Sequence, residues 1–123
     1  MLSIAAASAS PAPSAHAPAS PSSASAARGA EIYEAKCGAC HSLDQNRIGP
    51  KHRGVFGRKA GAVPDFPYTA ALKKSGIVWN AKTLDTWLQS PVKMVPGTAM
   101  GFQLRSAQER ADVIAYLKQQ SGK

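Results

Sequence analysis

The chain has 123 residues, and its 15 Lys and Arg against 7 Asp and Glu give a formal net charge of +8. This length suits one modest domain and argues against a two-domain enzyme. The two Cys are too few for a disulfide framework, and no apolar run approaches the roughly 18 residues that indicate a membrane-spanning helix.

The N-terminal segment, residues 1–27, is almost entirely Ala, Ser and Pro and contains no Lys, Arg, Asp or Glu. Such a segment has too little apolar bulk to build a packed face. Residues 14–17 and 23–26 place small side chains at the spacing that a signal peptidase accepts. We interpret residues 1–27 as a leader, such as a signal-peptide remnant, or as a flexible linker, and residues 28–123 as the folded domain.

The first helix is expected from Gly29 to Cys40. Its larger apolar residues follow helical spacing, and Glu31 and Glu34 in the opening turns favour the helix dipole. The following stretch, residues 42–67, is rich in Gly and Pro and lacks any alternation long enough for a strand. We therefore expect it to be loop.

Two shorter helical segments are expected next. One is a turn around Thr69 to Lys74, closed by Gly76. The other runs near Lys82 to Gln89, carries its apolar residues on one face, and cannot extend past Pro91.

The last helix has the clearest start signal in the chain. Ser106 and Glu109 form an S-x-x-E capping box before an apolar stripe, and Gly122 follows as a plausible end. Together these elements predict a mostly α fold.

The run Cys37-Gly38-Ala39-Cys40-His41 is the C-x-x-C-H signature for covalent attachment of a c-type haem. Two thiols separated by two residues of a helical turn can reach the two vinyl groups at one edge of the porphyrin. The next residue then offers an imidazole to the iron. A haem would also supply the large apolar body that this thin core lacks.

Three other interpretations of the cysteine pair stay open. A zinc site needs further ligands, and beyond His41 the domain offers only His52. A thioredoxin-type redox pair needs a βαβ surround that the helical periodicity does not supply. A chance match is the third.

An electron-carrying haem needs a sixth iron ligand, and the candidates are His52, Met94 and Met100. Met100 follows the rigid loop of residues 96–99, between two expected helices, which could present its thioether opposite His41. Met94 is the weaker candidate. His52 stands between two basic residues and is expected to be a solvated loop residue.

The residues from Arg28 to Lys118 resemble class I cytochrome c, the monohaem type of mitochondria and its bacterial c2-like relatives. The resemblance covers nearly the whole folded segment and depends on an ordered series of motifs. These lie at residues 29–41, 48–50, 54–61, 66–69, 76–79, 83–91, 96–100 and 112–118.

This resemblance implies an all-α fold in which three to five helices, the N- and C-terminal ones crossing, wrap one haem c attached through Cys37 and Cys40. It implies His41 and Met100 as the axial ligands. Gly29 and Tyr33, with Val113 and Tyr116, match the family's helix crossing.

The resemblance also implies roles around the haem. The carbonyl of Pro50 would accept the second ring N–H of His41. Trp87 stands where the family often has a Tyr whose hydroxyl bonds toward the methionine sulfur. The positions that hold or neutralise the haem propionates are Arg58, Tyr68, Trp79 and Thr98.

The function so implied is that of a soluble, monomeric one-electron carrier rather than an enzyme, with a fairly high reduction potential. The basic surface would steer it to acidic docking surfaces of membrane redox complexes, a cytochrome bc1-type donor and an oxidase or reductase acceptor. No nucleic-acid motif accompanies the charge. A haem protein with an open sixth position is the alternative.

Thioether-linked haem is assembled outside the cytoplasm, so the periplasm is the expected location. Attachment to the outer face of the inner membrane and the mitochondrial intermembrane space are the alternatives.

Overall fold

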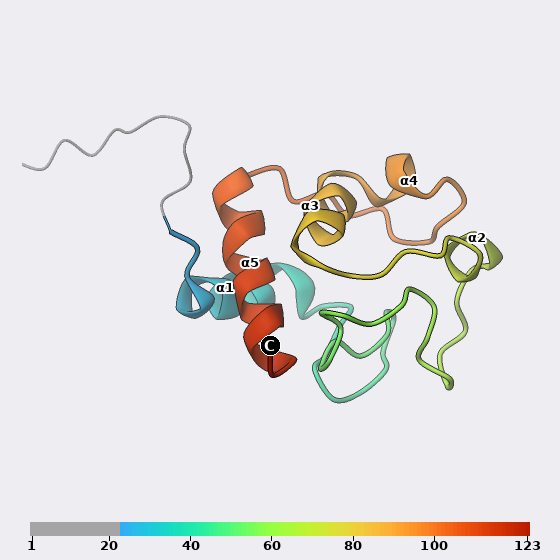
Figure 1. The fold of residues 1–123 in the computed structure, drawn as a ribbon, viewed down its shortest axis with the longest axis horizontal. Helices are drawn as coiled ribbons and strands as arrows, with labels where there is room; N and C mark the ends of the chain where they lie inside the picture. Colours follow the sequence, from blue (N-terminus) through green and yellow to red (C-terminus); the bar gives the residue numbers. More distant parts are fainter. Residues whose placement is uncertain (1–22) are drawn as a thin grey trace, which may run out of the picture.

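The computed structural model describes residues 23–123, whose helices enclose a loop-rich centre (Figure 1). No strand occurs between residues 23 and 123, where the only sheet-like pairing is an isolated antiparallel bridge between Lys59 and Val78. The mostly α prediction is therefore confirmed. The helical elements are α1 (Ala26–Ile32), a π-helical turn η1 (Tyr33–Cys37), α2 (Ala70–Lys73), α3 (Ala81–Gln89), α4 (Pro91–Met94) and α5 (Ala107–Gln120).

Helix α1 begins earlier than the sequence indicated. Ser25 is its N-cap, and the Ser25 side chain accepts a hydrogen bond of 3.1 Å from the backbone N–H of Arg28. The helix therefore starts at Ala26, inside the segment that we interpreted as leader or linker. The expectation for residues 1–22 lies outside the described residues.

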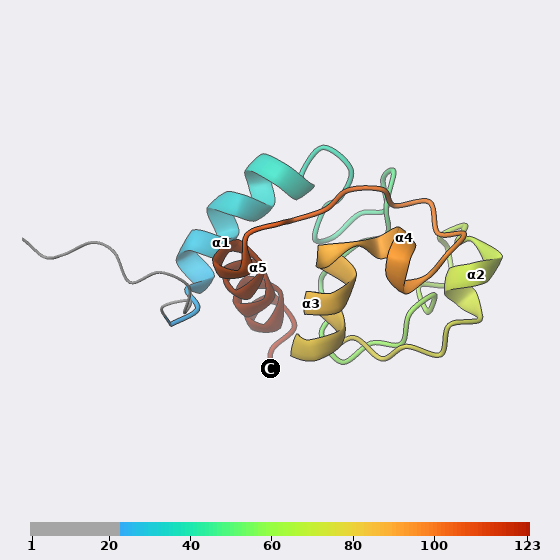
Figure 2. The ribbon, with the colours of Figure 1, turned by 90° about the horizontal axis from the view of Figure 1, so that it is seen from above.

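Helices α1 and α5 cross at one end of the molecule (Figure 2). A Cβ built on Gly29 would collide with the backbone carbonyl of Asp112 and lie 2.9 Å from Cβ of Tyr116. The missing side chain at this position therefore lets the two backbones approach closely. One turn further on, the rings of Tyr33 and Tyr116 pack with their centroids 5.5 Å apart.

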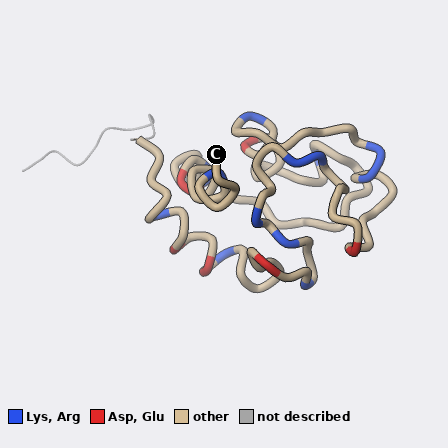
Figure 3. Tube along the Cα trace, turned by 60° about the horizontal axis from the view of Figure 1, so that its bottom comes forward, with Lys and Arg blue, Asp and Glu red and all other residues tan. Residues whose placement is uncertain are grey.

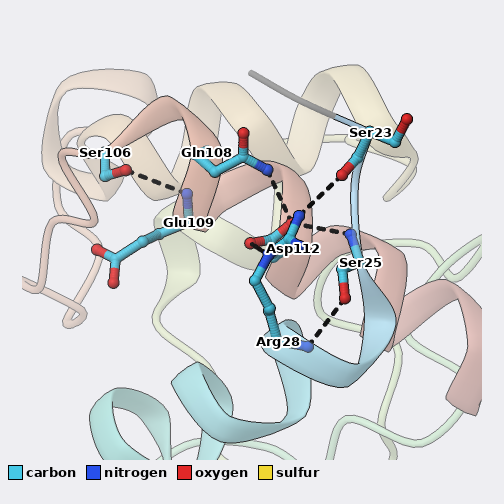
Figure 4. Close-up of polar contacts among 7 residues, drawn as sticks. All are labelled: Ser23, Ser25, Arg28, Ser106, Gln108, Glu109 and Asp112. Atoms are coloured by element: carbon cyan, nitrogen blue, oxygen red, sulfur yellow. Dashed lines mark hydrogen bonds and ion pairs between the residues drawn. The ribbon is translucent and has the colours of Figure 1, made fainter. Parts of the chain in front are cut away.

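A buried carboxylate also joins the two helices (Figure 4). Asp112 on α5 accepts hydrogen bonds from the backbone N–H of Ser25 at 2.8 Å, from Nε of Arg28 at 2.9 Å and from Nε2 of Gln108 at 3.0 Å. Only 2% of the Asp112 side chain is exposed. The start of α1 is thus held in place by a residue near the other end of the chain.

Helices α3 and α4 follow one another with a sharp bend at Ser90. Asn80 and Thr83 form a capping box at the start of α3, and Leu84, Trp87 and Leu88 are its buried residues. Pro91 ends α3 as predicted, but it also occupies the first turn of α4, where its missing N–H costs nothing. This second helix was not predicted from the sequence.

Within residues 23–123, none of the helices has the length and apolar character needed to cross a membrane.

Candidate functional site

A cavity of about 570 Å³ lies at the centre of the fold. Its walls come from η1 and the turn after it, from the loop of residues 47–69, from α3 and α5, and from residues 98–102. Most of the wall is apolar and includes buried core side chains. All ten residues expected at the cofactor line this one cavity, namely Cys37, Cys40, His41, Pro50, Arg58, Tyr68, Trp79, Trp87, Thr98 and Met100.

The two cysteines lie at the end of η1 and in the turn after it. The backbone N–H groups of Cys40 and His41 both donate to the carbonyl of Cys37, at 3.1 and 2.9 Å, and this turn brings both thiols to the cavity wall. Burial, with a smaller contribution from Cys40, raises the pKa of Cys37 to about 11. A thiol that stays protonated at neutral pH does not suit the thiolate chemistry of a thioredoxin-type pair.

His41 is buried at the cavity wall, and its ring orientation is fixed by a hydrogen bond. Its Nδ1 lies 3.0 Å from the carbonyl oxygen of Pro50, an acceptor, so Nδ1 carries the proton and Nε2 keeps its lone pair. Burial lowers the pKa of His41, which favours the neutral imidazole that binds metals. A Cβ on Gly49 would collide with this ring, so the loop backbone also confines it.

His52 is not the solvated loop residue that we expected. Its ring stacks on the ring of His41, with centroids 3.9 Å apart and planes inclined by 20°, and it lines the cavity. Its Nδ1 lies 2.9 Å from the hydroxyl of Tyr33. Burial, with His41 next in size, lowers the pKa of His52 well below its usual range, so the ring is neutral at physiological pH. The flanking basic residues indicated exposure to solvent, and no local pattern signals the contact between the two rings.

The structure distinguishes the two candidate methionines. Met100 lines the cavity together with His41, whereas Met94 ends α4 and is not among the residues that line it. The loop before Met100 turns at Gly97, whose φ of 93° suits glycine, and the N–H of Thr98 donates to the carbonyl of Val95 at 3.1 Å. A tight backbone turn therefore precedes Met100 at the cavity wall.

Arg58 and Trp79 are brought together by backbone pairing beside the Lys59 to Val78 bridge. The N–H of Trp79 donates to the carbonyl of Arg58 at 2.9 Å. The guanidinium of Arg58 is half-buried and donates to the carbonyl of Lys51 at 2.7 Å, and none of the ion pairs among residues 23–123 includes it. Burial lowers the pKa of Arg58. A half-buried cation on a cavity wall without a carboxylate partner suits an anionic group in that cavity.

Other polar side chains could add to this anion site. The hydroxyl of Tyr68 accepts a hydrogen bond of 3.1 Å from the backbone of Val63 and keeps its own proton to donate. Thr98 and Trp79, whose side chains carry a hydroxyl and an indole N–H, line the same cavity. Trp87 packs edge-on against Trp79, with ring centroids 5.2 Å apart, as a buried part of the apolar wall.

These features fit a haem and do not fit a zinc site. The cavity has a mostly apolar wall, two thiols next to an imidazole, and a cation that has no carboxylate partner among residues 23–123. A porphyrin with two carboxylates requires each of these features. The zinc alternative needs a cluster of ligands, and the described residues include no group of three or more His, Cys, Asp or Glu that could hold a metal ion. Fold and site together define a small helical haem protein with covalent attachment.

Comparisons with known proteins agree with this class. Residues 26–121 match the family model described as cytochrome c. The chain is 44% identical over 95 residues to cytochrome c of Gibberella zeae, covering 74% of this chain and 90% of that protein. It is 43% identical over 95 residues to cytochrome c of Sesamum indicum, covering 74% and 86%.

A solved structure of cytochrome cH from Methylobacterium extorquens superposes with a TM-score of 0.74 at 41% identity, covering 77% of this chain and 98% of that one. The chain therefore belongs to the cytochrome c family and has the class I fold. Its members carry electrons on one covalently bound haem c, and Cys37 and Cys40 supply the matching thiols.

Proposed function

We propose that this protein is a one-electron carrier, not an enzyme, with His41 and Met100 as the axial ligands of its haem iron. The observation that carries the proposal is the shared cavity: an imidazole with a free Nε2 and a thioether from a distant loop both line it, beside the two thiols. When bound, the haem supplies a ferrous–ferric couple that takes up and releases one electron.

Each group of residues has a separate task in this proposal. Cys37 and Cys40 anchor the porphyrin edge through thioethers. Pro50 holds the proton of His41 on Nδ1, so that Nε2 stays available to the metal. The guanidinium of Arg58, the indole N–H of Trp79 and the hydroxyls of Tyr68 and Thr98 receive the propionates. The apolar wall, including Trp87, excludes water.

The surroundings favour a fairly high reduction potential. A thioether is a soft ligand that favours ferrous iron, and an apolar cavity disfavours the extra positive charge of the ferric state. Both effects act in the same direction.

The charge of the protein supports acidic partners. Lys and Arg are spread over the loops and helices and outnumber the acidic residues (Figure 3). The cavity wall contains no Asp or Glu from the described part of the chain, and of its cations Lys36 pairs with Glu109 at 3.0 Å and Arg58 is assigned to the propionates, which leaves Arg47 to add to the surface charge. We infer that this basic surface docks on acidic surfaces of membrane redox complexes, a cytochrome bc1-type donor and an oxidase or reductase acceptor, with the protein acting as a monomer.

Because thioether attachment of haem occurs outside the cytoplasm, we propose the periplasm as the location. The outer face of the inner membrane and the mitochondrial intermembrane space are the alternatives. Intact-mass measurement of the native protein reports haem attachment and leader cleavage together.

The ligand proposal is tested by comparing Met100→Ala with Met94→Ala. The wild-type protein and Met94→Ala should show the methionine-to-iron charge-transfer band when oxidised and should bind carbon monoxide slowly when reduced. Met100→Ala should lose the band and bind carbon monoxide rapidly. Rapid binding by the wild-type protein would instead support the alternative, a haem protein with an open sixth position. Unchanged spectra in Met100→Ala would remove Met100 from its role.

A further inference from the structure

We propose that Tyr33 and His52 form a positioning pair that fixes the ring of His41 and lowers the reduction potential below the value that an apolar neighbour would give. This inference rests on the proposed function, in which His41 binds the iron. It assigns a role to two residues that the ligand set does not use.

The ring of His52 stacks on the ring of the proposed iron ligand. His52 lies face to face on His41, with centroids 3.9 Å apart and planes inclined by 20°. A ring stacked on His41 is on the same side of the metal as His41, so His52 cannot serve as the sixth ligand. It is placed to act on the electronic surroundings of the ligand instead.

The ring of His52 is itself held in place by hydrogen bonds. Its backbone N–H donates to the carbonyl of Ser42 at 3.0 Å, one residue after His41, and its carbonyl accepts from Val55 at 2.9 Å. The hydroxyl of Tyr33 and Nδ1 of His52 share a hydrogen bond of 2.9 Å. These contacts fix both the position and the rotation of the His52 ring.

Tyr33 in turn belongs to the crossing of the terminal helices. It is 7% exposed, packs on Tyr116 of α5, and meets the His52 ring edge-on with centroids 5.6 Å apart. A continuous series of rings therefore runs from α5 through Tyr33 and His52 to the iron-binding imidazole.

The direction of the effect follows from charge. Oxidation adds one positive charge to the iron and its ligands, and part of that charge is carried by the His41 ring. An aromatic ring presents a negative face to a group stacked on it, and this attraction is stronger where water is excluded. His52 therefore stabilises the ferric state, which lowers the potential. An aliphatic side chain at this position provides no such face.

The test uses purified holoprotein and paired variants. Removing one partner alone would leave a buried hydroxyl or ring nitrogen unpaired, so the central comparison is between two double variants. The ring-deleted variant combines Tyr33→Phe with His52→Leu and removes the stacked ring. The ring-retained variant combines Tyr33→Phe with His52→Phe and keeps an aromatic ring of similar size. Tyr116→Phe is the control. It removes a hydroxyl from the same series of rings but leaves the hydrogen bond between Tyr33 and His52 in place.

Three quantities are measured for each protein: the reduction potential by redox titration, the g-values of the oxidised protein by electron paramagnetic resonance, and the urea midpoint of unfolding. The g-values report the orientation of the axial ligand planes. A merely structural role would change the unfolding midpoint and leave the potential and the g-values as they are.

We expect an upward shift of the potential in the ring-deleted variant, a smaller shift in the ring-retained variant, and none in Tyr116→Phe. We also expect Tyr33→Phe alone to change the g-values. Equal potentials in the wild type and both double variants, or a downward shift in the ring-deleted variant, would overturn the inference. The wild-type charge-transfer band is recorded first, so that a failure of the His41 and Met100 proposal is distinguished from a failure of this one.

Discussion

Replacing Asp112 with Asn tests how the two terminal helices are held together. The change keeps the shape of the side chain and removes its charge. In the native protein one oxygen of Asp112 accepts from Ser25, Gln108 and Nη2 of Arg28, and the other accepts from Nε of Arg28. An amide nitrogen at either position would face a donor instead of accepting from it.

The expected cost can be worked from burial. Breaking a fully buried ion pair costs about 3–5 kcal/mol. Here the Asp112 side chain is 2% exposed but Arg28 is 50% exposed, so water resolvates the cation in the variant. Because exposed partners reduce the contribution of an ion pair, we expect a loss of about 2–3 kcal/mol.

Urea unfolding of the holoprotein measures this loss. With a slope of about 2 kcal/mol per M, the midpoint of the Asp112→Asn protein should fall by about 1–1.5 M. The matched control is Asp44→Asn. Asp44 also faces an arginine in a two-contact pair, with Arg53, but the two side chains are 65% and 49% exposed. Because both side chains of this pair are exposed to water, Asp44→Asn should lower the urea midpoint much less than Asp112→Asn does.

The pH dependence provides an independent check. Burial raises the pKa of Asp112, but the hydrogen bonds from Arg28, Ser25 and Gln108 lower it by more, and the net pKa lies below the ordinary value of 3.8. A depressed carboxyl pKa stabilises the fold above the unfolded pKa, and this stability is lost as pH falls through the folded pKa. The difference between wild type and Asp112→Asn should therefore be constant near neutrality and shrink below pH 3.8. Equal urea midpoints for the Asp112→Asn and Asp44→Asn proteins at pH 7 would refute the reasoning.

Three further predictions concern the helix crossing, the imidazole and the surface charge. Gly29→Ala should lower the free energy of unfolding by about 1–3 kcal/mol, measured in urea, because the new Cβ would meet the backbone of Asp112. Helix propensity alone would make alanine the more stabilising residue, so a raised urea midpoint would contradict the packing argument. Gly49→Ala should displace the His41 ring and change the spectrum and potential of the oxidised protein, because its Cβ would collide with the ring; a spectrum and potential identical to those of the wild type would show that the loop does not confine the ring. Reduction of hexacyanoferrate(III) by the ferrous protein should slow as ionic strength rises, and a cationic cobalt oxidant should show the opposite trend; a flat dependence for both would argue against steering by the basic surface.

Some parts of this protein were determined by local sequence alone. The start of α5 follows from Ser106, whose hydroxyl accepts from the backbone of Glu109 at 3.1 Å, because a cap needs only residues three positions apart. Helix α3 ends at Gln89 because Pro91, two residues later, has no backbone N–H to continue the helix. The C-x-x-C-H run indicated its cofactor because its chemistry lies within five consecutive residues.

Other features depended on contacts between residues far apart in the chain. The start of α1 combines a local cap, from Ser25 to the N–H of Arg28, with a bond from the backbone of Ser25 to Asp112, 87 residues away, and no local pattern could reveal that second partner. His52 became a half-buried, stacked ring because an irregular loop folded it against His41, although its basic neighbours indicated solvent. Periodicity and capping depend on distances along the chain, whereas these contacts depend on how loops without periodicity close around a cavity, and only the tertiary structure determines that.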